Sequence, residues 1–331
     1  MLILKYPVLK DMEGATKYSS WKLALWNSFK NFRRGSLKED ANNENSAPQA
    51  KRLRVTQSDD PDITEDDYDN AVQELNGGKK KKGSKKRSKL SAREVKQLLQ
   101  KTRHKRNSWI RNDKPLVSDV TEKFPQLVKS RWLRHEFKAV LCSEVDVYAK
   151  LENWQDWKKK LIQAAKLEAF TRPTIKKLLQ ELGLCEELSC PDDAIDAICL
   201  DLLVKLLYPQ GIGKGAVFLK IIESCDVDLG DELLDIQQSE PFLVVTSKPG
   251  TETSQMFVCC EGKLFLESKC IKEAILDLVS TYFVFDISYP KSIYSVMVFI
   301  QHFIFDLEDE QSVPQAVATL VTNIKKLPAE L

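Results

Sequence analysis

The chain has 331 residues, of which 43% are hydrophobic, enough to build a hydrophobic core over part of its length. Its 50 Lys and Arg residues nearly balance 48 Asp and Glu residues, but residues 1–111 carry 26 basic against 14 acidic side chains. The first third is therefore net +12 and the remainder, by difference from the total of +2, net −10. This division excludes an evenly charged globular chain and predicts a basic segment, suited to an anionic partner, joined to a mildly acidic folded body.

Apolar stretches are too short for export or for membrane insertion. The one at the N-terminus ends at Lys5, well before the length of a secretory signal. Near the C-terminus, Asp277, Asp286 and Pro290 interrupt the apolar residues, so none of these stretches reaches the roughly 18 residues that a membrane helix needs. We therefore expect an intracellular protein that neither spans nor crosses a membrane.

Residues 1–34 predict a basic N-terminal helical motif. From residue 19 onward, apolar side chains recur at spacings of four, four and three, which places them on one stripe of a helix: Trp21, Leu25, Phe29 and Phe32. Basic side chains fall on an adjoining face: Lys22, Lys30, Arg33 and Arg34. The motif is either a core helix with solvated charges or a cationic surface.

Residues 35–90 have few large apolar side chains and predict a disordered charged linker. Its acidic stretch, residues 58–69, begins with Ser58. Because Asp59 and Asp60 follow, Ser58 is a candidate phosphorylation site for a kinase with a basic substrate groove. Added negative charge there could mask the basic residues that follow in the linker.

Residues 79–89, here called the lysine run, contain eight basic side chains among eleven residues: Lys79, Lys80, Lys81, Lys82, Lys85, Lys86, Arg87 and Lys89. A flexible cationic stretch of this kind suits the acidic groove of a nuclear-import receptor or a phosphate backbone. The run predicts nuclear import; the alternative is a solubilising linker that no receptor reads.

Residues 91–210 predict a helical region. Ser91 and Glu94 have the spacing of a capping box, so a helix is expected to begin there and to run to about residue 110. Further helices are expected at residues 118–123, 130–141, 145–170, 173–182 and 192–208. In the helix expected at residues 145–170, Trp154 and Trp157 fall on the apolar face and are expected in the core. Thr171 is expected to cap the next helix and Gly183 to end it.

Residues 211–331 predict an α+β region. Glycines at positions 211–215 predict a turn and not a phosphate-binding loop. Three β-rich runs at residues 242–247, 256–260 and 263–266, the last two separated by Glu-Gly, predict an antiparallel meander. Helices at residues 271–285 and 292–305 are expected to cover it. The predicted fold class is thus mainly α with a C-terminal α+β part, in which helices cover a small three-stranded sheet.

Nothing in the sequence predicts catalysis, a cofactor or a metal. The three histidines are scattered, and the eight cysteines contain no C-x-x-C pair. In a reducing compartment Cys142, Cys199 and Cys225 are expected to be small buried apolar residues. Motifs of serine hydrolases, zinc proteases and kinases are lacking, so we expect a protein that is not an enzyme.

A second function class comes from the basic first third, which could bind nucleic acid electrostatically. The residues predicted to make such contacts lie in the first helical motif and in the helix after Ser91: Lys22, Lys30, Arg33, Arg34, Lys101, Arg103, Lys105 and Arg106. No complete sequence-reading motif accompanies them, so base-specific recognition is not expected.

Four sets of motifs carry a family resemblance. They are K-Y-P-V-L-K-D with Y-S-S-W-K and K-N-F-R-R; K-R-N-S-W-I-R; V-S-D-V-T-E-K-F-P-Q-L with R-H-E-F-K; and F-V-F-D-I-S-Y-P-K with F-I-Q-H-F-I-F. In this order they make the chain similar to the sterile alpha motif domain-containing protein 3-like family, a vertebrate group abundant in fish. The chain departs from that name because it contains no sterile alpha motif domain. The resemblance therefore implies an intracellular region and no site residues.

Together these observations predict a non-enzymatic nuclear interaction protein. Its lysine run would bind a nuclear-import receptor and its folded body an unidentified protein partner. Nucleic-acid binding by the basic third is the alternative function, and the cytoplasm the alternative location.

Overall fold

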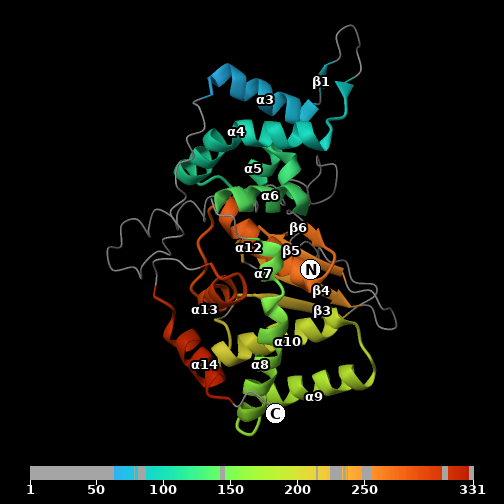
Figure 1. The fold of residues 1–331 in the computed structure, drawn as a ribbon, viewed down its shortest axis with the longest axis vertical. Helices are drawn as coiled ribbons and strands as arrows, with labels where there is room; N and C mark the ends of the chain where they lie inside the picture. Colours follow the sequence, from blue (N-terminus) through green and yellow to red (C-terminus); the bar gives the residue numbers. More distant parts are fainter. Residues whose placement is uncertain are drawn as a thin grey trace, which may run out of the picture. The chain divides into compact units, whose positions relative to one another are not determined.

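Helices make up most of the part of the chain that the structure describes, and a four-stranded sheet lies in its C-terminal half (Figure 1). This computed structural model describes residues 63–77, 79–80, 87–141, 146–213, 215–223, 233, 236, 238–247, 255–307 and 312–327. The described residues all belong to one unit, Ala50–Leu331. The predicted fold class, mainly helical with a C-terminal α+β part, is confirmed, while the predicted motif at residues 1–34 lies outside the described residues.

The sheet has the strand order β3-β4-β5-β6. Strand β3 (Leu219–Glu223) runs parallel to β4 (Phe242–Ser247), whereas β5 (Gln255–Cys260) and β6 (Lys263–Ser268) continue the sheet antiparallel. The predicted meander corresponds to β4, β5 and β6, but the prediction of three strands is wrong because β3 adds a fourth. A parallel pair has a long connection in place of a hairpin, so β3 lacks the turn residues that marked the other strands.

The turn between β5 and β6 consists of the predicted Glu261 and Gly262, whose φ angles are +55° and +69°. Two successive residues of positive φ form the tight turn whose twist matches an antiparallel hairpin, and glycine meets no steric penalty there. The Glu261 carboxylate also accepts hydrogen bonds from the backbone N–H of Val117 (2.8 Å) and Ser118 (3.1 Å). The hairpin turn thereby caps helix α5 (Val117–Lys123), which has no side-chain cap of its own.

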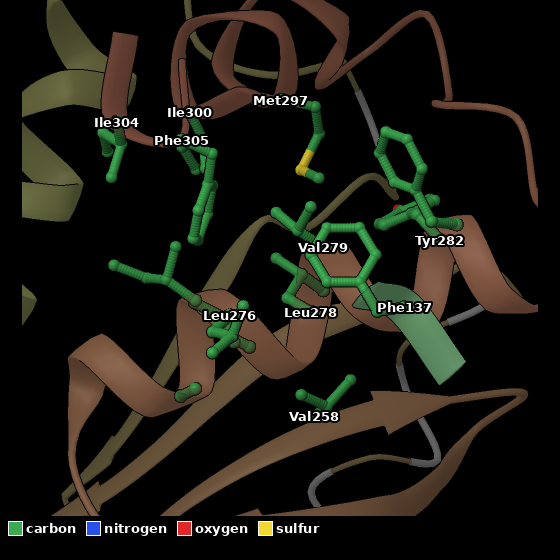
Figure 2. Close-up of a cluster of buried hydrophobic side chains, with 14 of the residues drawn as sticks. Phe137, Val258, Leu276, Leu278, Val279, Tyr282, Met297, Ile300, Ile304 and Phe305 are labelled. Atoms are coloured by element: carbon green, nitrogen blue, oxygen red, sulfur yellow. The ribbon is translucent and has the colours of Figure 1, made fainter. Parts of the chain in front are cut away.

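Helix α12 (Ile271–Val284) lies between the sheet and helix α6 (Ser130–Val140) (Figure 1). Because it is covered on both sides, α12 buries apolar residues all around its circumference. Figure 2 shows this core: Phe137 of α6 approaches α12 from one side, Val258 of β5 from another, and Met297 and Ile300 from a third. The rings of Phe137 and Phe283 meet edge to face, with centroids 5.2 Å apart.

Helix α3 (Glu65–Gly77) lies inside the segment predicted to be a disordered linker, so that prediction is wrong for residues 65–77. The helix buries Tyr68, Ala71, Val72 and Leu75, whose spacings of three and four place them on one stripe that packs against the next helix. The abundant charges of this segment obscured the stripe. Burial against a neighbour stabilises a helix whose own composition does not indicate one.

Helix α4 (Ala92–Asp113) begins as predicted. The backbone N–H of Glu94 donates to the Ser91 hydroxyl (3.3 Å), and the backbone N–H of Ser91 donates to the Glu94 carboxylate (2.8 Å). Both halves of the capping box are therefore present. The helix ends three residues after the predicted residue 110, and Lys114 follows it with a φ of +47°. A short 3-10 helix, η2 (Pro125–Val128), joins α5 to α6.

The helix predicted at residues 145–170 is two helices, α7 (Val147–Lys150) and α8 (Asn153–Glu168). Asp146 caps α7 by accepting from the N–H of Tyr148 (3.1 Å), and the chain turns before α8 begins. Trp154 is fully buried, as predicted, and Trp157 is half-buried against Phe299, with ring centroids 5.1 Å apart.

Helices α9 (Pro173–Glu187) and α10 (Asp192–Leu207) pack against each other and against α8. Two details predicted for α9 are wrong: Arg172 and not Thr171 occupies the N-cap, and the helix continues through Gly183. Gly183 lies inside α9, and no atom comes within 4 Å of the position that a side chain would take there. After α10 the glycine-rich segment is a turn, as predicted, with positive φ at Gly211 and Gly215.

The C-terminal helices complete the core. Within the predicted helix at residues 292–305 the structure has α13 (Tyr294–Phe299) followed by a π-helical turn, η3 (Ile300–Ile304). Helix α14 (Gln315–Lys325), which was not predicted, packs against α8 and α13. One hydrophobic core continues across residue 210, so the predicted boundary between residues 91–210 and 211–331 divides the sequence but not the core. Among the described residues, no helix combines the length and apolar character that crossing a membrane requires.

Candidate binding face on helices α3 to α5

Two basic residues predicted to contact nucleic acid pair with acidic residues of α3. Lys101 of α4 lies 3.2 Å from the Asp67 carboxylate, and Lys105 forms an ion pair with Glu65. Hydrogen bonds from Lys101 and Thr64 hold the pKa of Asp67 below its usual value. Exposed pairs of this kind contribute little stability each, but they align α3 along α4.

The two arginines predicted to contact nucleic acid bind Glu136 of α6 inside the protein. Arg103 approaches the Glu136 carboxylate at 3.0 and 3.1 Å, and Arg106 donates to the same carboxylate. Arg106 also donates to the Thr102 hydroxyl (2.9 Å) and to the Leu99 carbonyl (3.2 Å). The side chain of Arg106 is 0% exposed, so its prediction as a nucleic-acid contact is wrong. Arg103, with 15% of its side chain exposed, is largely committed to Glu136.

The charge of Glu136 depends on these arginines. Burial alone would raise the pKa of Glu136, but the Arg106 guanidinium and the hydrogen bonds from His135 and Arg103 outweigh it and lower the pKa to about 2. Burial also lowers the pKa of Arg106, from a value so high that the guanidinium stays protonated at neutral pH. The Arg106 guanidinium and the Glu136 carboxylate therefore both stay charged inside the protein.

A hollow of about 410 Å³ opens between α3, α4 and the end of α5. We call it the α3–α4 hollow, and its lining residues are Glu65, Tyr68, His104, Lys105, Ser108, Trp109, Asn112, Asp113 and Lys123. The Nζ atom of Lys123 lies 4.9 Å from the ring centroid of Tyr68 and 5.1 Å from that of Trp109. Both distances are within the range of cation–π attraction, so an ammonium group is held between two aromatic faces.

Sequence reasoning missed Tyr68 and Lys123 as members of one site. Trp109 follows Lys105 by four residues, which puts both on one face of α4. No local spacing connects them with residue 68 or residue 123, because packing of three separate helices brings these residues together.

A second hollow of about 490 Å³ lies between α9, α10 and β3. Its charged residues pair along their own helices: Lys177 with Glu181 at 3.4 Å and Lys205 with Asp201 at 3.8 Å. Burial raises the pKa of Asp201. These pairs leave this hollow less suited to a charged ligand than the α3–α4 hollow.

The lysine run connects α3 to α4. Lys79–Lys80 (β1) pairs antiparallel with Arg87–Ser88 (β2), so residues from both ends of the run lie side by side. Lys89, which follows β2, is exposed. The remaining predicted site residues lie outside the described residues: Lys22, Lys30, Arg33, Arg34, Ser58, Lys81, Lys82, Lys85 and Lys86.

Among the described residues, no cysteine lines either of the two hollows. Cys199 and Cys259 are 0% exposed, and burial raises the pKa of each thiol to about 12, so both stay protonated. Cys199 is buried as predicted, while Cys142 and Cys225 are outside the described residues. Within the described ranges, no three or more His, Cys, Asp or Glu side chains are grouped as metal ligands would be.

No protein-family model matches the chain, and neither a curated protein nor a solved structure is significantly similar to it. The resemblance to the sterile alpha motif domain-containing protein 3-like family therefore stays a prediction carried by its motifs.

Proposed function

We propose that the chain is a non-enzymatic nuclear interaction protein in which the lysine run serves import and the folded body binds a protein partner. The observation that carries this proposal is how the basic residues of the first third are used. On α4, Arg103 and Arg106 neutralise a carboxylate of α6, and Lys101 and Lys105 pair with α3.

Four basic residues of α4 are thus used within the protein, while the sequence concentrates eight basic residues in the lysine run. The run begins two residues after α3 ends and finishes two residues before the Ser91 cap of α4. It is anchored at both ends to helices that belong to the core. A short basic run held between two helices suits recognition by an acidic groove.

Import is tested by the location of a fluorescent fusion that is too large for free diffusion into the nucleus. Replacing all eight basic residues of the lysine run by Gln should leave the fusion in the cytoplasm. The matched control replaces exposed lysines elsewhere, Lys138, Lys159 and Lys176, by Gln and should stay nuclear. Nuclear accumulation of both variants would refute the import role.

A second candidate function, nucleic-acid binding by the basic first third, is favoured by one feature of the described residues. In the α3–α4 hollow a lysine ammonium lies over two aromatic rings. Proteins combine cations and aromatic rings in this way to bind single-stranded nucleic acids.

A further inference from the structure

The ammonium group of Lys123 has an unusual environment. It contacts the faces of Tyr68 and Trp109, and no carboxylate of the described residues lies within 4.0 Å of it. The backbone at Lys123 is fixed, because its carbonyl accepts a hydrogen bond from the Asn76 side chain (3.1 Å). A positioned cation that lines a hollow and lacks a close counter-ion is a candidate partner for an anionic ligand.

The charges behind the hollow add to this preference. Arg103 and Arg106 share the single carboxylate of Glu136, which leaves one positive charge in excess within the layer. Lys105 and Glu65 cancel each other at the rim. Arg106 lies over the ring of Phe124 (5.1 Å), and Phe124 in turn contacts Tyr68 edge to face (6.5 Å). The Arg106 guanidinium therefore lies behind Tyr68, with the ring of Phe124 between them.

Acidic residues oppose an anion here, because Glu65 and Asp69 act on Tyr68 and Asp113 lines the hollow. Asp113 lines the hollow and is exposed to solvent, where its carboxylate is screened. Its charge offsets part of the attraction of Lys123, and its removal should strengthen the binding of an anion.

The polar residues of the hollow can recognise more than a charge. His104, Ser108 and Asn112 line it together with Trp109, and the Asn112 amide donates to the Ser108 hydroxyl (3.2 Å). The Ser108 hydroxyl can still donate, and the Asn112 carbonyl can still accept. A volume of about 410 Å³ is within the range of small-ligand sites.

From these observations we propose that the α3–α4 hollow binds one nucleotide of a single-stranded nucleic acid, with its base against Trp109 and its phosphate on Lys123. A lysine ammonium and an indole in one hollow match a phosphate and its base, whereas a phosphate alone would need no aromatic surface. A base inside a duplex cannot reach the indole, so the strand must be single. This proposal develops the second candidate function and is independent of import.

The test uses the full-length chain whose eight basic residues in the lysine run are replaced by Gln, so that the run contributes no binding. Fluorescence anisotropy of a labelled hexauridylate measures the dissociation constant at low salt. Lys123→Gln should weaken binding about tenfold, as expected for the loss of one charge-assisted contact, and Lys123→Arg should restore most of it. Trp109→Leu should weaken binding by about tenfold or more through lost stacking. Asp113→Asn should tighten it two- to threefold, roughly the effect of one screened charge.

Lys138→Gln, on the exposed side of α6, is the matched control and should leave the dissociation constant unchanged. Circular dichroism establishes that each variant is folded. The proposal is overturned if the run-neutralised chain does not bind the hexamer, or if Lys123→Gln and Lys138→Gln bind alike. It is also overturned if inorganic phosphate competes as well as uridine monophosphate, or if a duplex binds as tightly. None of these failures would affect the import experiment, which depends on the lysine run alone.

Discussion

Arg103 and Arg106 show how a residue type can be read correctly and its role wrongly. Each was predicted to face an anionic ligand, and each does bind an anion, the Glu136 carboxylate of this same chain. Sequence spacing places them on α4 but does not say which helix covers that side. A guanidinium suits such a site because its planar donors can meet a carboxylate at two points.

Glu136 predicts acid sensitivity. The folded state holds its pKa at about 2, below the ordinary value of 4.5. Because the pKa is lowered in the folded state, Glu136 stabilises the fold at pH values above its unfolded-state pKa. This contribution is lost as the pH falls from about 4.5 through about 2. Glu136 should therefore contribute on the order of 3 kcal/mol of pH dependence over that window.

Urea unfolding at several pH values, on the wild type and on Glu136→Gln, measures this contribution. The variant should be less stable at pH 7 and should depend less on pH below 4.5, because Gln does not titrate. The exposed Glu122→Gln is the control and should follow the wild type. Equal pH dependence in wild type and Glu136→Gln would contradict the role of this carboxylate.

At the scale of single elements, some helices are capped by residues nearby in the sequence and others by residues far away. The capping box of α4 was predicted because Ser91 and Glu94 are three residues apart, close enough for each side chain to reach the other's backbone N–H. Helix α5 has Leu116 at its N-cap and receives its cap from Glu261, more than a hundred residues later. Helix α12 likewise receives one from Asp193, which accepts from the N–H of Ile271 (2.8 Å).

The remote cap of α5 can be tested at Glu261. Glu261→Asn keeps a residue that tolerates the left-handed backbone of the turn, but its side chain is too short to reach Val117. We expect a loss of about 1–2 kcal/mol in the free energy of unfolding, measured by urea denaturation. Glu267→Asn, whose exposed side chain lies on the same hairpin, is the control. A loss no larger than that of the control would show that the cap contributes nothing.

Across the whole molecule, one buried charge cluster joins three elements. Asp277 of α12 accepts two hydrogen bonds from Arg134 of α6 (2.6 and 2.8 Å) and one from Ser268 of β6 (2.7 Å). Asp277 is 0% exposed and Arg134 only 7%. The cluster links the helical region before residue 210 to the α+β region after it.

This link predicts that both regions unfold together. Asp277→Asn leaves Arg134 without its fully buried partner and should cost about 3–5 kcal/mol. Urea unfolding followed by tryptophan fluorescence and by far-ultraviolet circular dichroism should give one shared transition in both proteins, at a lower midpoint in the variant. Asp156→Asn, at an exposed position on α8, should not shift the midpoint. Separate transitions for the two probes would contradict a single core.

The sequence by itself determined the mainly helical class, the capping box at Ser91, the burial of Trp154 and the hairpin closed by Glu261 and Gly262. Each depends on residues close together in the chain, where periodicity and turn chemistry act. Only the tertiary structure decided that α3 folds within a charged segment, that β3 joins β4 in parallel and that Lys123 meets Tyr68 and Trp109. These features depend on burial between distant segments, and burial stabilises a helix, a strand or an ion pair only once its partner is in place.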